Sequence, residues 1–322
     1  MPEPPGSLSA VTVVFEAEVP LLELQARSIE RHVKDGLFEE YVVIDNTRDG
    51  LSPRARERIR AELGGHGDIL TFTSGDVLGA GADLASSGWR SQQILKLMVA
   101  RLLATDRYVV LDAKNHFIES TTRADFFDWA TGRPHGGIHS FEQHPLRPQL
   151  EHVAVALGLE PALAVQRFTA TAPPVVLDCR VVNAIVADIG AGDPRRFALE
   201  FERSGYTEFF LYSAWQVARG ATLDDLVSGR SLVSPTVWAG GSGPADVRAV
   251  LDQADASDTT TLAIHRRALA KLSPESVHDL AEFWTRHGLF DTSGDAERFI
   301  RRFRIVYLRA MGVKRLRERL SR

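Results

Sequence analysis

The sequence predicts an α/β fold in which a mostly parallel sheet is covered by helices on both faces. Two observations lead to this prediction. Short runs of apolar, β-branched residues alternate along the chain with longer stretches of helical period. These runs are continuously apolar rather than alternating apolar and polar, which is typical of strands buried on both faces of a parallel sheet.

The first third of the chain supplies the elements in order. We expect strands at residues 11–15 ("VTVVF"), 41–44 ("YVVI"), 69–73 ("ILTFT") and 108–111 ("YVVL"). We expect helices at residues 21–33, 53–63 and 88–103, the second with a proline in its first turn, where helices tolerate it. In the third helix, one stripe would face the core and leave Gln92, Gln93 and Lys96 toward another side; the stripe consists of Ile94, Leu95, Met98 and Leu102.

Bulk composition limits the function. The chain has 322 residues, of which 44% are hydrophobic and 25% charged, so it can bury a full core. A formal net charge of -4 gives no general attraction to nucleic acid, and we expect no nucleic-acid partner. The single cysteine, Cys179, excludes an internal disulfide and a cysteine metal cage. The start "MPEPPGSLSA" lacks the features of a signal peptide, and we expect a cytoplasmic protein.

Acidic residues follow three of the expected strands. Glu16, Asp45 and Asp112 stand at the carboxyl ends, where open α/β sheets bind their ligands. Lys114, Asn115 and His116 crowd after Asp112 in "YVVLDAKNHFI", which indicates a binding site. Asp and Asn are also ordinary turn residues, so Asp45 and Asp112 have a purely structural interpretation as well.

Several common sites are not indicated. "FEAEVP" after the first strand contains no glycine, and the G-x-G in "LGAGADL" has Leu84 where a dinucleotide-binding loop has its third glycine. No Walker motif is present. "GGSGP" around Ser242 ends in Pro244, so it does not form the nucleophile elbow of serine hydrolases.

The order of the motifs resembles that of a known family. "VTVVF", "VVIDN", "GWRSQQILKLMVARLL" and "YVVLDAKNHFI" follow one another as in the nucleotide-sugar-binding half of GT-A glycosyltransferases, which have a Rossmann-like fold. The helix with Q-Q-x-L-K-L is similar to that of a poorly characterised bacterial branch. The resemblance continues into "SGYTEFFLYSAW" and "TTLAIHRRA" and covers about residues 11–268. It implies a GT-A-like catalytic domain over residues 1–268 and a helical extension over residues 269–322.

The resemblance implies a glycosyltransferase that moves a sugar from a nucleoside-diphosphate donor, with UDP the favoured nucleotide, to an unidentified acceptor. In the family, the acid that ends the second strand contacts the nucleotide, and Asp45 is its match. The Asp-x-Asp motif contacts ribose and a divalent cation; Asp112 matches its first acid, but Lys114 stands at the second. Other expected donor-binding residues are Glu16, Gln93, Lys96 and Asn115, although Gln93 and Lys96 would also suit a solvated helix face.

The lysine in the motif leaves two mechanisms open. The leaving nucleoside diphosphate develops negative charge that a cation must neutralise. Asp112 and His265, with help from Asn115, would ligate Mn²⁺ or Mg²⁺, because His265 falls where the resemblance places a ligand. Alternatively, Lys114 replaces the metal. The position of His265 slightly favours the metal.

A general base is expected at the start of the helix in "YTEFFLYSAW". An inverting transferase needs a base for the acceptor's proton, and Glu208 matches the acid that often serves this purpose in the family. An acid there is also favoured by the helix dipole alone. Tyr212 lies one turn further on the same face and is expected to contact acceptor or sugar.

The last 25 residues, 298–322, are rich in arginine and have apolar residues at helical spacing. A basic amphipathic helix of this kind suits peripheral membrane contact or an anionic acceptor, or it packs by its apolar stripe with solvated arginines. Residues 228–244 are rich in Ser, Gly and Pro and read as a loop. Because the Asp-x-Asp motif is incomplete, a non-catalytic GT-A-like module that binds a nucleotide or glycan is the second functional hypothesis.

Overall fold

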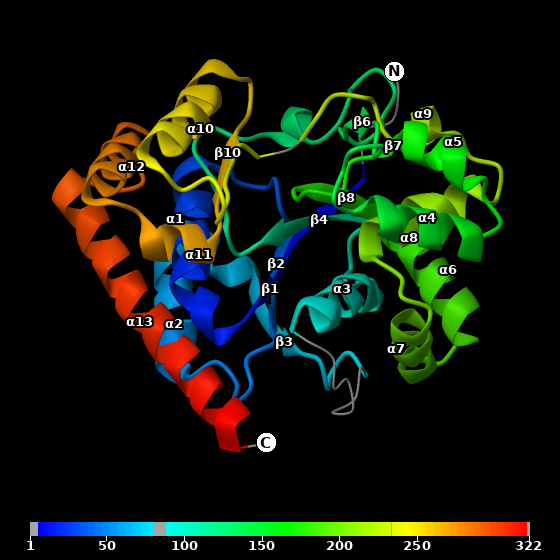
Figure 1. Ribbon diagram of the computed structural model, residues 1–322, viewed down its shortest axis with the longest axis horizontal. Coiled ribbons are helices and arrows are strands. Elements are labelled where there is room, and N and C mark those ends of the chain that lie inside the picture. The colour runs from blue at the N-terminus through cyan, green and yellow to red at the C-terminus, as the bar shows by residue number, and fades with distance from the viewer. Residues whose placement is uncertain (1–5, 80–87, 233, 321–322) are drawn as a thin grey trace.

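A central sheet of five strands confirms the predicted α/β class (Figure 1). The computed structural model describes residues 6–79, 88–232 and 234–320, with side chains as far as residue 313. The strand order is β3-β2-β1-β4-β8. The first four strands are parallel and β8 is antiparallel to β4; the strands are β1 (Leu8–Val14), β2 (Glu40–Asp45), β3 (Leu70–Ser74), β4 (Arg107–Asp112) and β8 (Val175–Asp178).

The four predicted parallel strands lie where the apolar runs placed them, whereas β8 was not predicted. The first strand starts at Leu8, three residues earlier than predicted. Its second residue is a buried serine, Ser9, whose hydroxyl donates to Glu40 Oε1 at 2.9 Å and lies 2.6 Å from Thr105 Oγ1. A polar residue satisfied in this way does not interrupt a strand, although it hides the strand's start from an apolar pattern.

Helices cover both faces of the sheet. One layer contains α1 (Val19–His32), α2 (Pro53–Glu62), α10 (Pro244–Ala256), α11 (Arg266–Lys271), α12 (Pro274–Arg286) and α13 (Ser293–Leu320). The other contains α3 (Gly88–Met98), α4 (Arg147–Ala156), α5 (Pro161–Gln166), α6 (Cys179–Gly190), α7 (Pro194–Arg203), α8 (Glu208–Val217) and α9 (Leu223–Leu226).

Helix α3 differs from its prediction in two respects. It ends at Met98 and continues as a 3-10 turn over Val99–Arg101, so Leu102 lies outside the helix and is 46% exposed. The prediction of Leu102 as a core residue was wrong. Gln93 and Lys96, by contrast, are buried in the protein rather than solvated.

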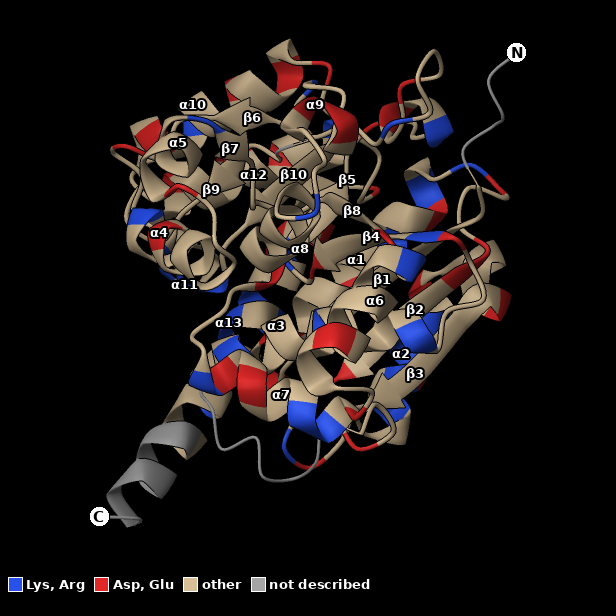
Figure 2. Cartoon of the chain, turned by 90° about the vertical axis from the view of Figure 1, so that its right-hand side faces the viewer, with Lys and Arg blue, Asp and Glu red and all other residues tan. Residues whose placement is uncertain are grey.

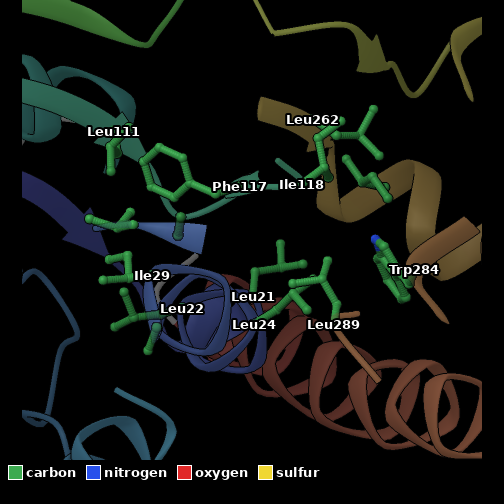
Figure 3. Close-up of a cluster of buried hydrophobic side chains, with 14 of the residues drawn as sticks. Leu21, Leu22, Leu24, Ile29, Leu111, Phe117, Ile118, Leu262, Trp284 and Leu289 are labelled. Carbon is green, nitrogen blue, oxygen red and sulfur yellow. The ribbon is translucent and has the colours of Figure 1, made fainter. Parts of the chain in front are cut away.

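Two hydrophobic clusters lie on opposite faces of the sheet. Alternate residues of β4 enter each: Val109 and Leu111 one cluster, Tyr108 and Val110 the other. The first cluster joins the sheet to α1 and to the last two helices, and Figure 3 shows Leu111 and Phe117 near Leu22 and Ile29, with Trp284 at the far side. The predicted C-terminal extension therefore packs into the same core as the first helix.

A second, smaller sheet brings distant segments to the end of β4. Its order is β5-β10-β9, where β5 (Asn115–Phe117) follows β4 after a tight turn. β10 (Thr261–Ile264) pairs antiparallel with β5 and parallel with β9 (Thr236–Val237), which lies inside the predicted loop 228–244. A separate ladder joins β6 (Ile138–His139) to β7 (Phe168–Thr169).

Charged residues of both signs are spread over the face in Figure 2, in agreement with the small net charge. Gly81 and Leu84 of the "LGAGADL" stretch lie outside the described residues. Among the helices of the described chain, none combines the length and the apolar character that crossing a membrane would need.

Candidate functional site

Four charged side chains meet where strand β4 ends. Lys96, on α3, donates from Nζ to Asp112 Oδ1 at 2.9 Å and to Glu208 Oε1 at 3.4 Å. Lys114, two residues beyond the strand, donates to the other oxygen of Asp112. We call Lys96, Asp112, Lys114 and Glu208 the Asp112 cluster. It joins the end of β4, the last turn of α3 and the start of α8.

The neighbours of each group in the Asp112 cluster set its protonation. Burial raises the pKa of Asp112, but Lys114 and Lys96 lower it more, so its pKa is well below the usual value. Burial lowers the pKa of Lys96, yet the carboxylates of Asp112 and Glu208 bring it above the usual value. Burial raises the pKa of Glu208 more than Lys96 lowers it. The cluster thus holds two ammonium groups, one firmly ionised carboxylate and one carboxylate with an increased proton affinity.

The turn that carries Asp112 and Lys114 is fixed from behind by Gln25 of α1. The Gln25 amide donates to the backbone carbonyls of Asp112 and Asn115, each at 2.8 Å. Its carbonyl oxygen accepts hydrogen bonds from Thr12 at 2.7 Å and Tyr41 at 2.6 Å. Three of these four hydrogen bonds are buried and the one to Asp112 is partly buried, so the turn is held firmly.

Asn115 also acts within this turn. Its side-chain oxygen accepts the backbone N–H of Asp112 at 2.9 Å, and its NH₂ group donates to Ser234 Oγ at 3.0 Å and to the carbonyl of Pro173 at 3.2 Å. The residue is 1% exposed. Asn115 therefore shapes the site rather than presenting an amide to a ligand.

Aromatic and charged groups form the rim next to Lys114. Trp238, which directly follows β9, is 53% exposed, and its ring centre lies 5.6 Å from Lys114 Nζ. The His265 ring lies 6.1 Å from the Trp238 ring, and burial together with Arg266 lowers the pKa of His265 to about 4. Arg266 pairs with Glu18 and lies over the ring of Phe15 at 5.3 Å.

Three of the predicted site residues outside the Asp112 cluster bind backbone N–H groups elsewhere. Glu16 accepts the backbone N–H of Arg48. The Asp45 carboxylate accepts the backbone N–H groups of Thr47 at 3.1 Å and Leu51 at 2.5 Å, so it organises the loop after β2. The Tyr212 hydroxyl accepts the N–H of Asp178 at 3.1 Å.

The position of Tyr212 follows from the sheet. Asp178 pairs with Arg107, the first residue of β4, whereas Asp112 is its last residue. Tyr212 is therefore near the opposite end of that strand from the Asp112 cluster. Gln93, the remaining predicted residue, lies on α3 one turn before Lys96 and is 1% exposed.

The donor atoms at the predicted divalent-cation site of Asp112 and His265 are largely engaged by other groups. Each carboxylate oxygen of Asp112 is bound by an ammonium group. His265 Nδ1 accepts the N–H of Arg267 at 3.2 Å, which leaves only Nε2 of that ring. Among the described residues, no group of three or more His, Cys, Asp or Glu side chains is arranged to hold a metal. A cation ligated by Asp112 would stand beside two ammonium groups, so this donor set does not fit it.

Sequence reasoning missed three residues of the site. Gln25 sits within an otherwise amphipathic helix, and an isolated buried amide gives no sequence signal for its partners. Glu18 lies two residues after the predicted Glu16, and the 3-10 turn Glu16–Glu18 directs it to Arg266. Trp238 reaches the rim only because β9 pairs with β10.

The fold and site define an α/β protein with a charged cluster at the carboxyl edge of a mostly parallel sheet. Residues 13–228 match the model of a family of unknown function, DUF6492, and the chain belongs to this family. No curated protein matches the chain significantly.

The chain is also similar, at low identity, to solved structures of glycosyltransferases. The galactosyltransferase LgtC, in complex with donor and acceptor sugar analogues, is 13% identical and has a TM-score of 0.45 over 89% of this chain and 95% of that chain. The bifunctional glycosyltransferase WbbM, in its apo form, is 12% identical with a TM-score of 0.45 over 82% of this chain and 46% of that chain. The apo form of the glycosyltransferase GlyE from Streptococcus pneumoniae is 12% identical and has a TM-score of 0.41 over 91% of this chain and 62% of that chain.

Proposed function

We propose that this protein is a glycosyltransferase that moves a sugar from a nucleoside-diphosphate donor to an acceptor hydroxyl. The observation that carries the proposal is the Asp112 cluster, in which two ammonium groups and a buried carboxylate of raised pKa meet at the carboxyl edge of a parallel sheet. Ligands of open α/β sheets bind at this edge. The order of sequence motifs that resembles GT-A glycosyltransferases supports the same reaction class.

Positive charge at the Asp112 cluster would stabilise the nucleoside diphosphate as it leaves. In the transfer, the acceptor oxygen forms a bond to the anomeric carbon while the bond from that carbon to the diphosphate breaks and its electron pair leaves with the nucleoside diphosphate. Lys114, which lies at the rim beside Trp238, would neutralise this negative charge. Asp112 holds both lysines in position through its two oxygens.

Glu208 is the proposed general base. It would take the proton of the acceptor hydroxyl as that oxygen attacks the anomeric carbon. Burial raises the pKa of Glu208, so this carboxylate holds a proton more readily than an exposed glutamate does. Lys96, 3.4 Å away, keeps the carboxylate oriented while the proton moves.

The proposed mechanism needs no divalent cation, because the donor atoms of Asp112 are already occupied by Lys96 and Lys114. UDP stays the favoured donor nucleotide from the sequence. The acceptor is unidentified, and a cytoplasmic location stays a prediction.

The experiment that tests this function is the release of free nucleoside diphosphate from UDP-, GDP- and dTDP-sugars incubated with the protein and a panel of hydroxyl acceptors. We expect release from one donor class. Binding of a nucleoside diphosphate without any turnover would instead support the second hypothesis, a non-catalytic module.

The basic end of α13 is proposed as a peripheral membrane contact. The helix lies on the outside of its helical layer (Figure 1). Ile305, Leu308 and Val313 are about half exposed or more, and Arg301 and Arg309 beside them are exposed. Apolar side chains flanked by arginines suit the surface of an anionic bilayer.

A further inference from the structure

Two polar side chains beside the Asp112 cluster have no hydrogen-bond partner. The amide oxygen and nitrogen of Gln93 and the hydroxyl of Thr207 are inaccessible to solvent and unpaired. Gln93 is 1% exposed and Thr207 is 7% exposed. Buried polar groups are nearly always paired, because each one left unpaired lowers stability. Two such residues next to a proposed active site therefore indicate a ligand.

The flanking contacts put Gln93 on the side of α3 that packs against the start of α8. Arg90, Gln93 and Lys96 follow one another at three-residue spacing on one side of α3. Arg90 donates to the carbonyl of Tyr206, and Lys96 donates to the carboxylate of Glu208. Gln93 lies between Arg90 and Lys96 on the helix, and Thr207 lies between Tyr206 and Glu208 in the chain. The side of α3 that carries Gln93 is thus packed against Thr207.

Thr207 also lacks its usual local role. It is the N-cap residue of α8, where a threonine hydroxyl normally accepts a backbone N–H of the first turn. Here the side chain makes no such hydrogen bond. Its hydroxyl is therefore free to serve a molecule outside the helix.

We propose that Gln93 and Thr207 form a subsite for vicinal hydroxyl groups of the transferred sugar. The amide of Gln93 offers two N–H donors and a carbonyl acceptor, and the Thr207 hydroxyl donates and accepts. This combination matches sugar hydroxyls, which also donate and accept, and it provides no net charge for a diphosphate. The assignment rests on the proposed function, since it places the sugar next to the proposed base, Glu208. Because the Gln93 amide is inaccessible to solvent in the unliganded chain, sugar binding requires this side chain to rotate, and it has no side-chain hydrogen bonds to break.

The variants Gln93→Leu and Thr207→Val test the subsite, because each keeps the size of the side chain and removes its polar atoms. Calorimetry compares UDP-glucose, UDP-galactose, GDP-mannose and dTDP-glucose with the corresponding free nucleoside diphosphates. The wild type should bind one sugar nucleotide more tightly than its nucleoside diphosphate. We call the ratio of these two affinities the sugar increment. In each variant the sugar increment should fall about tenfold, while the affinity for the free nucleoside diphosphate should not change.

Thermal unfolding of the unliganded proteins gives a second readout. Both variants should have a higher Tm than the wild type, since an unpaired buried group has been removed. Thr73→Val is the matched control: its hydroxyl is also buried and unpaired, but it lies on β3, three strands from β4. This control should leave the sugar increment intact.

Three results overturn the proposal. If the variants keep the full sugar increment, a trapped water rather than a sugar occupies the subsite, and the proposed function survives. If the wild type shows no sugar increment with any of the four donors, the subsite does not hold sugar. If the wild type binds none of the nucleoside diphosphates, the proposed function itself fails.

Discussion

Lys96 donates a 2.9 Å hydrogen bond to Asp112, which joins the last turn of helix α3 to the last residue of strand β4. The same ammonium group reaches Glu208 at the start of α8. The buried Lys96 therefore links Asp112, which holds Lys114 in position, to Glu208, the proposed base. The relationship makes the cluster sensitive to the loss of any one member.

Glu208→Gln should reduce sugar transfer on the order of 10²-fold or more, because the amide cannot accept the acceptor's proton. Donor affinity should change little. Since the Glu208 pKa is raised, wild-type activity should fall as pH decreases through that raised pKa, where the base becomes protonated. Initial rates across pH measure both effects. Turnover equal to that of the wild type would remove Glu208 from the mechanism.

Asp112→Asn should destabilise the protein on the order of 3 kcal/mol at neutral pH, because Lys96 then keeps its charge without its main partner. The Asp112 pKa is lowered, so its stabilising effect is present above the ordinary aspartate pKa and is lost as pH falls through the lowered value. The difference in the free energy of unfolding between the wild type and Asp112→Asn should therefore become smaller below about pH 4. Urea unfolding at several pH values measures it, and a difference independent of pH would contradict this account.

Gln25→Leu should loosen the turn that carries Lys114, although Gln25 lies behind that turn. The change leaves the carbonyls of Asp112 and Asn115 and the hydroxyls of Thr12 and Tyr41 without their partner. We expect a loss of about 2–4 kcal/mol of stability and weaker nucleoside-diphosphate binding at temperatures where the variant is folded. Unfolding curves and calorimetry provide the two numbers. Unchanged affinity in the folded variant would show that Gln25 has no positioning role.

The double variant Ile305→Glu and Leu308→Glu should abolish sedimentation with vesicles containing phosphatidylserine, since it places two acids on the exposed side of α13. Binding of the wild type should weaken as salt rises. Leu199→Glu on α7 is the control, because Leu199 is 60% exposed and lies outside α13. If the wild type sediments no more with vesicles than without them, the proposed membrane contact is wrong.

Much of the fold could be predicted because the parallel strands are continuously apolar. Strand β8 was not predicted: only four residues long, it lies at the edge of the sheet and is antiparallel to β4. The placement of Asp112, Lys96 and Lys114 near one another follows from the end of a strand and the helix before it, so sequence could anticipate it.

The outer parts of the site depend on long-range pairing. Trp238 and His265 reach the rim through the β5-β10-β9 sheet, whose strands are only two to four residues long. Strands so short give no periodic signal. The carboxylate of Asp45 accepts backbone N–H groups within six residues, and such local hydrogen bonds are invisible in a motif. Its contact with the nucleotide stays a prediction.

The measurement that tests the central claim most directly is calorimetric binding of UDP to EDTA-treated protein, with wild type, Lys114→Ala and Lys34→Ala compared under the same conditions. Lys34 is an exposed lysine beyond the end of α1 and serves as the matched control. The account predicts that wild type and Lys34→Ala bind UDP without metal, whereas Lys114→Ala binds at least tenfold more weakly. Binding that appears only after Mn²⁺ or Mg²⁺ is added, and that Lys114→Ala retains, would contradict it.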